Sequence, residues 1–224
     1  NDYLVQPLVD AGLWDKISLM RIYGWHNGHA ARYNWKNPSA NKAGFINSMD
    51  VSHWAANLGY ETVALSGLNS NFNLTTEGAP ITNDNCTMFM WVEGLSDAGI
   101  YFGVSYGGNY LYSGVDAGSI YARINAPDTS AEYHGSIGSG AVSLGISRIN
   151  NTQDRFIING GAATTQTRNF DHMADADLYE LALNYGYPFV PQAGRRCFAF
   201  VLGGDIDEPA LHTIFANYRT ALSL

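Results

Sequence analysis

Tyrosine side chains gather in two short stretches of the 224-residue chain. The candidate ligand-binding residues there are Tyr106, Asn109, Tyr110, Tyr112, Tyr185 and Tyr187. A tyrosine ring offers an apolar face to a sugar ring and a hydroxyl group to its edge, at low cost in side-chain entropy. We therefore interpret this set as a contact surface for a glycan. Two alternatives stay open: the tyrosines contact a neighbouring subunit, or Tyr110 and Tyr112 pack across strands.

Other residues that could bind a metal or react are more readily explained by structural roles than by catalysis. His26 and His29 have the spacing of a metal-binding pair, but no carboxylate or cysteine stands beside them at ligand spacing. We interpret them as hydrogen-bonded loop histidines. Cys86 and Cys197 fall on expected strands, where a disulfide and two buried thiols are both open. Buried thiols are favoured, because cysteine behaves as a small hydrophobe in protein cores.

One strand is expected at the centre of the fold. Residues 85–94 form an apolar run of strand length, bounded on both sides by turn-forming residues. A strand that is buried on both faces has this pattern. Because side chains alternate along a strand, the run predicts core residues on both of its faces. These are Met88, Met90 and Val92 on one face and Phe89 and Trp91 on the other.

Further short strands, separated by glycine-containing turns, are expected along most of the chain. They lie at 44–47, 60–65, 72–75, 99–105, 109–113, 119–124, 142–148, 154–160, 177–184 and 196–202. Many short strands with turn signals at intervals of about ten residues are typical of a β-sandwich or barrel. Residues 126–140 show no clear period and are expected to form a loop.

Helices are expected at the two ends of the chain. Residues 2–20 place apolar side chains at helical spacing, interrupted by a proline and a glycine, which predicts two short helical pieces. Asp207 is the expected N-cap of a helix over 208–222, with Pro209 in its first turn. No linker or internal repeat divides the chain, so residues 1–224 are expected to form one domain.

The composition restricts the classes of partner. Charged residues make up 14% of the chain, against about 25% in a typical globular protein. A neutral surface rich in hydrogen-bonding groups is common in extracellular and virion β-proteins. The net charge is −8 and there is no basic run, so nothing would neutralise the phosphates of a nucleic acid. No apolar stretch approaches 18 residues, so no membrane-inserted segment is expected.

The order of these elements resembles the laminin-G-like, concanavalin A-like jelly rolls. The resemblance is carried by the central strand, the 156–160 hairpin, the strand at 196–202 and the terminal helix. More narrowly, the chain is similar to a group of such domains in phage and prophage virion proteins, often tail or appendage proteins. The stretches that carry this similarity are 9–16, 26–36, 47–54 and 71–73. The resemblance implies a jelly-roll β-sandwich, which in this family often holds a calcium ion.

The resemblance also prompts a search for catalytic carboxylates and for a calcium loop. Glycanases of this fold carry carboxylates on one strand, where alternation and a bulge bring them to one face. Asp175, Asp177 and Glu180 come near that pattern, but the first is aspartate and the triplet begins in a loop-like stretch. We interpret them as solvated residues that lead into a strand. No Asp-x-Asp-x-Asp-Gly calcium loop occurs.

The sequence thus predicts a single all-β domain, a concanavalin A-like jelly-roll β-sandwich with a short N-terminal helical segment and a C-terminal helix. The predicted function is that of a non-catalytic structural or appendage domain of a virion, of phage origin, located outside the cell. It would recognise a surface glycan or pack against other virion subunits as a homo-oligomer. No catalytic residue and no cofactor are expected, and a structural calcium ion is left open. The alternative is a glycoside hydrolase or polysaccharide lyase of the same fold.

Overall fold

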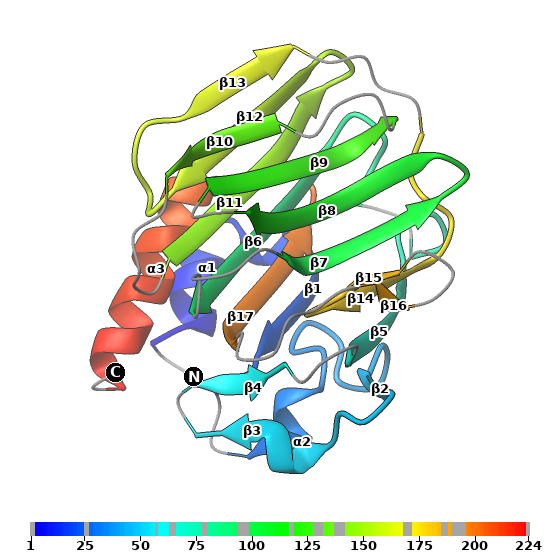
Figure 1. Ribbon diagram of the computed structural model, residues 1–224. Helices are drawn as coiled ribbons and strands as arrows, with labels where there is room; N and C mark the ends of the chain where they lie inside the picture. The colour runs from blue at the N-terminus through cyan, green and yellow to red at the C-terminus, as the bar shows by residue number, and fades with distance from the viewer. Residues whose placement is uncertain are drawn as a thin grey trace.

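Two β-sheets stack face to face, and helices cover one side of the pair in the computed structural model (Figure 1). The structure describes residues 3–24, 27–56, 58–62, 66–77, 80–93, 99–116, 119–127, 132–136, 142–167, 172–184, 188–189 and 196–222. The predicted all-β sandwich with a C-terminal helix is confirmed. Within these residues, no helix is both long and apolar enough to cross a membrane.

The first sheet is built around the strand that the sequence places at the centre. Its order is β13-β12-β11-β6-β17-β4-β3, and β1 also pairs with β17. The strands are β1 (Ile17–Ile22), β3 (Trp54–Ala55), β4 (Gly59–Glu61), β6 (Cys86–Glu93), β11 (Val142–Asn150), β12 (Gln153–Ile158), β13 (Thr164–Thr167) and β17 (Arg196–Gly203). Strand β6 lies between β11 and β17, so it is an interior strand, as predicted.

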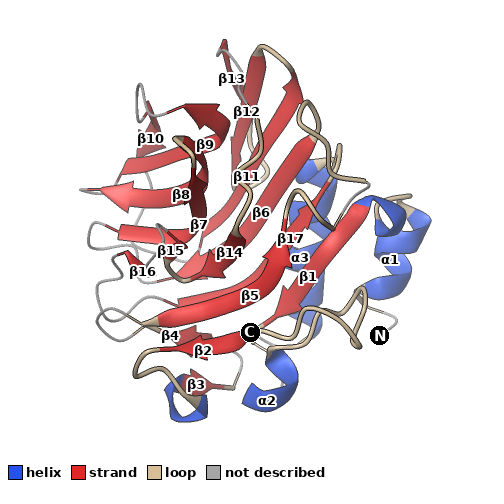
Figure 2. Cartoon of the chain, turned by 90° about the vertical axis from the view of Figure 1, so that its right-hand side faces the viewer, coloured by secondary structure: helices blue, strands red, loops and turns tan. Residues whose placement is uncertain are grey.

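The second sheet has the order β10-β9-β8-β7-β14-β5-β2, with β15 and β16 attached beside β7. Its strands are β2 (Gly44–Ile46), β5 (Gly67–Asn73), β7 (Gly99–Tyr106), β8 (Asn109–Asp116), β9 (Ser119–Pro127), β10 (Glu132–Ser136), β14 (Asp177–Glu180), β15 (Leu183–Asn184) and β16 (Pro188–Phe189). Figure 2 shows the resulting layers: this sheet, then the first sheet, then helices α1 (Val5–Asp10) and α3 (Glu208–Ala221).

Strand β6 contributes to two separate hydrophobic cores, as its alternation predicts. One core lies between the two sheets and contains Met88, Met90 and Val92. The other lies between the first sheet and the helices and contains Phe89 and Trp91. In the first core, the Phe102 ring of the second sheet stacks on Phe200 of the first at a centroid distance of 4.1 Å.

The C-terminal helix begins where its capping residue predicts. The Asp207 side chain accepts a hydrogen bond from the Ala210 N–H at 3.0 Å, and a proline lies in the first turn. Such a cap satisfies one of the backbone donors that a helix start leaves without an intrahelical partner. The apolar stripe of α3 packs on the first sheet, where the Phe215 ring lies 5.5 Å from that of Phe89. The remaining helical elements are short: η1 (Trp14–Lys16), α2 (Gly28–Ala31) and η2 (Val51–His53).

Three local predictions were wrong. Residues 17–20 belong to strand β1 rather than to a helix, because pairing with β17 competes with their helical spacing. The expected loop at 126–140 contains β10, which pairs with β9. The expected single strand at 177–184 is two strands, because Leu181 adopts a φ of 61° and breaks the extended chain. Each difference arises from tertiary pairing, which local sequence does not report.

Asparagine supplies most of the non-glycine left-handed backbone positions in the described part of the chain. The non-glycine residues with positive φ include Asn41, Asn47, Asn71, Asn125 and Asn159, at 50–55°. Asparagine tolerates this conformation better than other residues with a side chain. Two of these residues lie inside strands where the pairing register shifts, Asn71 in β5 and Asn125 in β9. Such bulges bend a strand and increase its twist.

Both cysteines are buried as free thiols, the outcome that the sequence favours. Burial raises the pKa of the Cys86 thiol to about 12, and the nearby Asp154 carboxylate adds to the shift. Because the thiolate is the reactive form, this thiol is unreactive at neutral pH.

Candidate functional site

The outer face of the second sheet bears no helix in the part of the chain that the structure describes (Figure 2). We call it the open face. Pairing registers place six residues in one row across it: Arg123, Tyr112, Gly103, Tyr179, Asn69 and Gly44. Residues directly opposite one another on neighbouring strands lie on the same face of a sheet. The row therefore runs from an aromatic half on β8 and β9 to a polar half on β14 and β5.

The aromatic half is a packed cluster. The Tyr112 ring meets those of Tyr110 and Tyr121 edge to face, at centroid distances of 5.9 and 5.8 Å. The Arg123 guanidinium lies 5.3 Å from the Tyr110 ring centroid and 5.7 Å from that of Tyr112. Tyr110 and Tyr112 are only 8% and 7% exposed, and they pack with Leu183. Their burial agrees with the packing alternative and leaves little of either ring for a ligand.

Tyr106 and Asn109 lie on the other side of the same hairpin. They pair with each other across the turn at Gly107-Gly108, and alternation puts them on the same face of the sheet as Val104 and Leu111, which point into the core. Tyr110 instead points to the open face. Tyr106 is 57% exposed, and Asn109 is buried with its amide nitrogen 2.7 Å from the His172 ring. The structure thus divides the predicted site. The last two predicted residues, Tyr185 and Tyr187, lie outside the described residues.

The polar half of the open face carries amide and carboxylate side chains that bond to each other. We call Asn69, Asn71, Asn73, Asp175 and Asp177 the amide ladder. The amide nitrogen of Asn69 donates to Asp177 at 3.2 Å, and that of Asn73 donates to Asp175 at 3.1 Å. Asn71 donates instead to the Lys42 carbonyl at 2.6 Å. Each amide is therefore held in one orientation by a partner.

The protonation states of this half suit the recognition of hydroxyl groups. Hydrogen bonds from the Thr75 hydroxyl and the Asn73 amide lower the pKa of Asp175, so it is an acceptor at neutral pH. Burial and the nearby Asp177 raise the pKa of Tyr179, so its phenol stays protonated and both donates and accepts. Tyr179 and Asp177 are half-buried and Asp175 is exposed. Planar acceptors beside planar donors match the vicinal hydroxyl groups of a sugar.

The amide ladder was not among the residues predicted from the sequence. Its signal is nevertheless present: asparagine recurs at every second position from 69 to 73, followed by Thr75. A period of two places such residues on one face of a strand. The aspartates of the ladder cannot be found this way, because they lie more than 100 positions away in the sequence.

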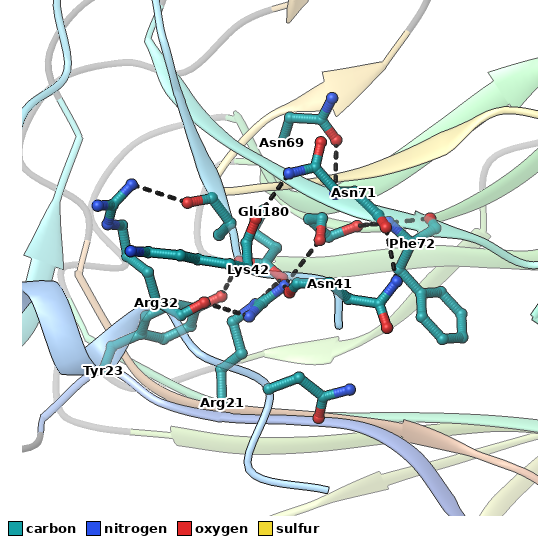
Figure 3. Close-up of polar contacts among 12 residues, drawn as sticks. Arg21, Tyr23, Arg32, Asn41, Lys42, Asn69, Asn71, Phe72 and Glu180 are labelled. Atoms are coloured by element: carbon teal, nitrogen blue, oxygen red, sulfur yellow. Dashed lines mark hydrogen bonds and ion pairs between the residues drawn. The ribbon is translucent and has the colours of Figure 1, made fainter. Parts of the chain in front are cut away.

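The acidic triplet does not share one face. Asp175 and Asp177 lie on the open face, whereas Glu180 points into the molecule and is fully buried. Its carboxylate accepts hydrogen bonds from Arg21 Nε at 2.6 Å and from the Tyr23 hydroxyl (Figure 3). Burial raises the pKa of Glu180, opposed by its attraction to Arg21. The prediction that Glu180 is solvated was therefore wrong, because its partners, on and just after β1, lie far away in the sequence.

The Arg21 guanidinium joins the segments that carry the amide ladder. Besides Glu180, it donates to the backbone carbonyls of Arg32, Asn41 and Ser70 (Figure 3). Ser70 lies on β5, between two asparagines of the ladder, and Glu180 follows Tyr179 on β14. One buried cation thus fixes β5 and β14 against β1. This network positions the ladder from beneath.

No group of three or more histidine, cysteine or acidic side chains gathers as a metal-binding set within the described ranges. Of the predicted histidine pair, His29 is exposed on α2 and His26 lies outside the described residues.

No model of a known protein family matches this chain, and no curated protein matches it. Several solved structures share its fold. The binding domain of botulinum neurotoxin serotype D matches 93% of this chain with 52% of its own length, at 10% identity and a TM-score of 0.62. Domain 4 of AbnA, a GH43 extracellular arabinanase from Geobacillus stearothermophilus solved with arabinotriose, matches 89% of this chain with 98% of its own length, at 11% identity and a TM-score of 0.59.

A further match is the ligand-binding domain of botulinum neurotoxin serotype D in complex with N-acetylneuraminic acid, at 10% identity and a TM-score of 0.59. This chain spans about half the length of the neurotoxin domains. At these identities the matches show a shared β-sandwich fold and no more. The neurotoxin neighbours are named as binding domains, and the arabinanase domain was solved with a sugar bound.

Proposed function

We propose that this chain is a non-catalytic glycan-binding module whose open face contacts the sugar. The observation that carries the proposal is the amide ladder beside Tyr179, an oriented set of donors and acceptors on a face that no described helix covers. The fold is shared with domains solved with N-acetylneuraminic acid and arabinotriose, which supports the same class of ligand here.

The ligand is a hydroxyl-rich glycan bound mainly through hydrogen bonds. Asp175 and Asp177 accept from sugar hydroxyl groups, the ladder asparagines donate to them, and the Tyr179 ring supports an apolar sugar face. Because the asparagines already hold their orientation, binding costs little side-chain ordering. The predicted residues fit this scheme in different roles. Tyr110 and Tyr112 form the floor beside the ladder. Tyr185 and Tyr187 remain proposed contacts, and Tyr106 would add a contact outside the open face, whereas Asn109 is buried and supports the hairpin.

We extend the proposal to the context of the domain. The sequence resemblance to phage and prophage appendage proteins supports a virion location outside the cell. A homo-oligomer would present several open faces at once, and multivalent display raises avidity without any new contact. The continuous pattern of elements supports residues 1–224 as one domain. The absence of a shared face for Asp175, Asp177 and Glu180 supports a binding role over the alternative of a hydrolase or lyase.

A glycan array followed by calorimetry tests the binding role, with arabinotriose and N-acetylneuraminic acid among the probes. Asp175→Ala should weaken the strongest hit about tenfold, the loss of one hydrogen bond to a charged group. Tyr179→Phe should weaken it by a smaller factor. Asp84→Ala is the matched control, because Asp84 is an exposed aspartate in the turn that precedes β6 of the first sheet. An array without hits, or an equal loss in the control, would refute the proposal.

Catalysis is tested with the same glycans. After prolonged incubation with wild-type protein, mass spectrometry should show every bound glycan intact. Release of shorter products, lost on replacement of Asp177 by Asn, would instead support the glycoside hydrolase alternative.

A further inference from the structure

A polar groove lies apart from the row of residues on the open face, bounded by β1, the 34–41 segment and the end of β5. Its volume is about 400 Å³, within the range of about 300–1,000 Å³ that small-molecule sites occupy. The residues that matter here are Ser18, Asn34, Asn37, Asn41, Phe72 and Glu77. Figure 3 shows Asn41 and Phe72 beside the buried Arg21 network.

The first wall is held rigidly by backbone contacts. The side-chain oxygen of Asn34 accepts from the N–H groups of Met20 and Lys36, at 3.1 and 3.0 Å, and its amide nitrogen donates to the Ser18 carbonyl at 3.2 Å. Asn34 is buried, with 1% of its surface exposed. This wall therefore does not rearrange when a ligand enters.

The opposite wall is fixed by Asn41. Its backbone is left-handed, with a φ of 54°, and its carbonyl accepts from the Arg21 guanidinium. Its amide nitrogen donates to the Asn71 carbonyl at 2.7 Å and to Glu77 at 3.1 Å. Asn71 is a member of the amide ladder, so the groove adjoins the polar half of the open face along the edge of β5.

The charged groups along the groove already have partners. The Lys36 ammonium donates to the Trp14 carbonyl at 2.6 Å and lies 3.5 Å from the Asp15 carboxylate. The Glu77 carboxylate accepts from Asn41. A lining of amides, one hydroxyl and charged groups that already have partners favours an uncharged ligand that carries several hydroxyl groups over an ionic one.

One polar atom on the groove lacks a partner. The Ser18 hydroxyl oxygen is buried and makes no hydrogen bond with any residue of the described part. A buried hydroxyl without a partner costs free energy that a ligand hydroxyl can recover. Below the polar rim, Phe72 belongs to the core between the sheets, with 1% of its surface exposed, and closes the floor of the groove.

We propose that this groove is a second saccharide site, separate from the open face, that takes one uncharged sugar residue. Ser18 and Asn37 contact the sugar hydroxyl groups, and Asn34 and Asn41 form the fixed walls. A module with two sites of modest affinity holds a multivalent surface glycan more tightly than either site alone.

The test is a titration of the whole chain with L-arabinose, D-galactose, D-glucose and N-acetyl-D-glucosamine, followed by the side-chain amide resonances of Asn34, Asn37 and Asn41. At least one sugar should shift these resonances with a Kd of about 1–10 mM, typical of a single small sugar. Ser18→Ala should weaken this binding several-fold, and Asn37→Trp should abolish it by filling the groove. Asn151→Trp, at an exposed asparagine in the turn between β11 and β12, is the matched control and should bind normally.

Two outcomes would overturn the inference. One is that none of the four sugars shifts the three amides at about 50 mM, a concentration that would nearly saturate a site with a Kd of about 10 mM. The other is that the shifts persist in Asn37→Trp while its backbone spectrum stays native. Asp175→Ala separates the two sites: it should leave the groove shifts unchanged, and their loss would mean that only the open-face site exists.

Discussion

Replacement of Glu180 should be among the most damaging single changes in this protein. Glu180 is fully buried and accepts from Arg21 Nε at 2.6 Å and from the Tyr23 hydroxyl. Glu180→Ala leaves the Arg21 cation in the core without its counter-charge, although three backbone carbonyls still accept from it. Breaking a buried pair in this way costs about 3–5 kcal/mol.

Glu180→Gln removes the negative charge of the side chain but keeps its size and shape. The amide keeps an acceptor for Arg21, but a hydrogen bond worth about 1.5–3 kcal/mol becomes an ordinary one of about 0.5–1.5 kcal/mol. The hydrogen bond from the Tyr23 hydroxyl weakens by a similar amount, so the free energy of unfolding should fall by about 2 kcal/mol in total. Arg21→Met should cost more than Glu180→Gln, because it leaves the carbonyls of Arg32, Asn41 and Ser70 without this donor.

Urea denaturation followed by tryptophan fluorescence measures these changes as differences in the free energy of unfolding. Glu77→Gln is the matched control: Glu77 is exposed, and surface changes of this kind usually stay within about 0.5 kcal/mol. A loss below about 1 kcal/mol for Glu180→Ala, with an unchanged denaturant slope, would show that the buried pair contributes little to stability.

Three further predictions concern the first sheet. Trp91→Ala should lower the free energy of unfolding by about 3–5 kcal/mol, because Trp91 packs in the core between the first sheet and α3. Chemical denaturation checks this, and a loss below about 1 kcal/mol would contradict it. Gly59→Ala should prevent folding, seen as loss of soluble protein, because Gly59 has a φ of 88° and a Cβ there would lie 2.0 Å from the Cys197 carbonyl oxygen. Burial lowers the pKa of His212, which stacks on Trp91, so the folded state binds fewer protons at this residue than the unfolded state does. The free energy of unfolding should therefore fall as the pH drops below about 6.5, the usual histidine pKa. Melting temperatures of the wild type and of His212→Gln across pH 5–8 check this, and an unchanged loss of stability with acid in the variant would contradict it.

The parts of the fold that the sequence predicts are those encoded locally. Within the run at 85–94, residues 86–92 are buried on both faces of the strand, so alternation alone separates the two cores. The start of α3 is likewise predictable, because Asp207 caps a helix through a residue three positions later. Local rules are sufficient where both partners lie within a few residues of each other.

The candidate site depends on partners that are distant in the sequence. Glu180 meets Arg21 across 159 positions, and Asn69 meets Asp177 across 108. No local pattern distinguishes a carboxylate that points inward to such a partner from one in solvent. The aromatic prediction illustrates the same limit: the stretch 106–112 is continuous in sequence, but strand alternation places Tyr106 and Tyr110 on opposite sides of the hairpin.

The separation of the helix-covered sheet from the open face has an evolutionary consequence. The side chains that stabilise the molecule project between the layers, whereas several members of the amide ladder are exposed or half-buried. Substitutions at such exposed positions usually change stability by no more than about 0.5 kcal/mol. Lineages that carry this fold can therefore diversify the residues of the open face rapidly, without losing the scaffold that presents them.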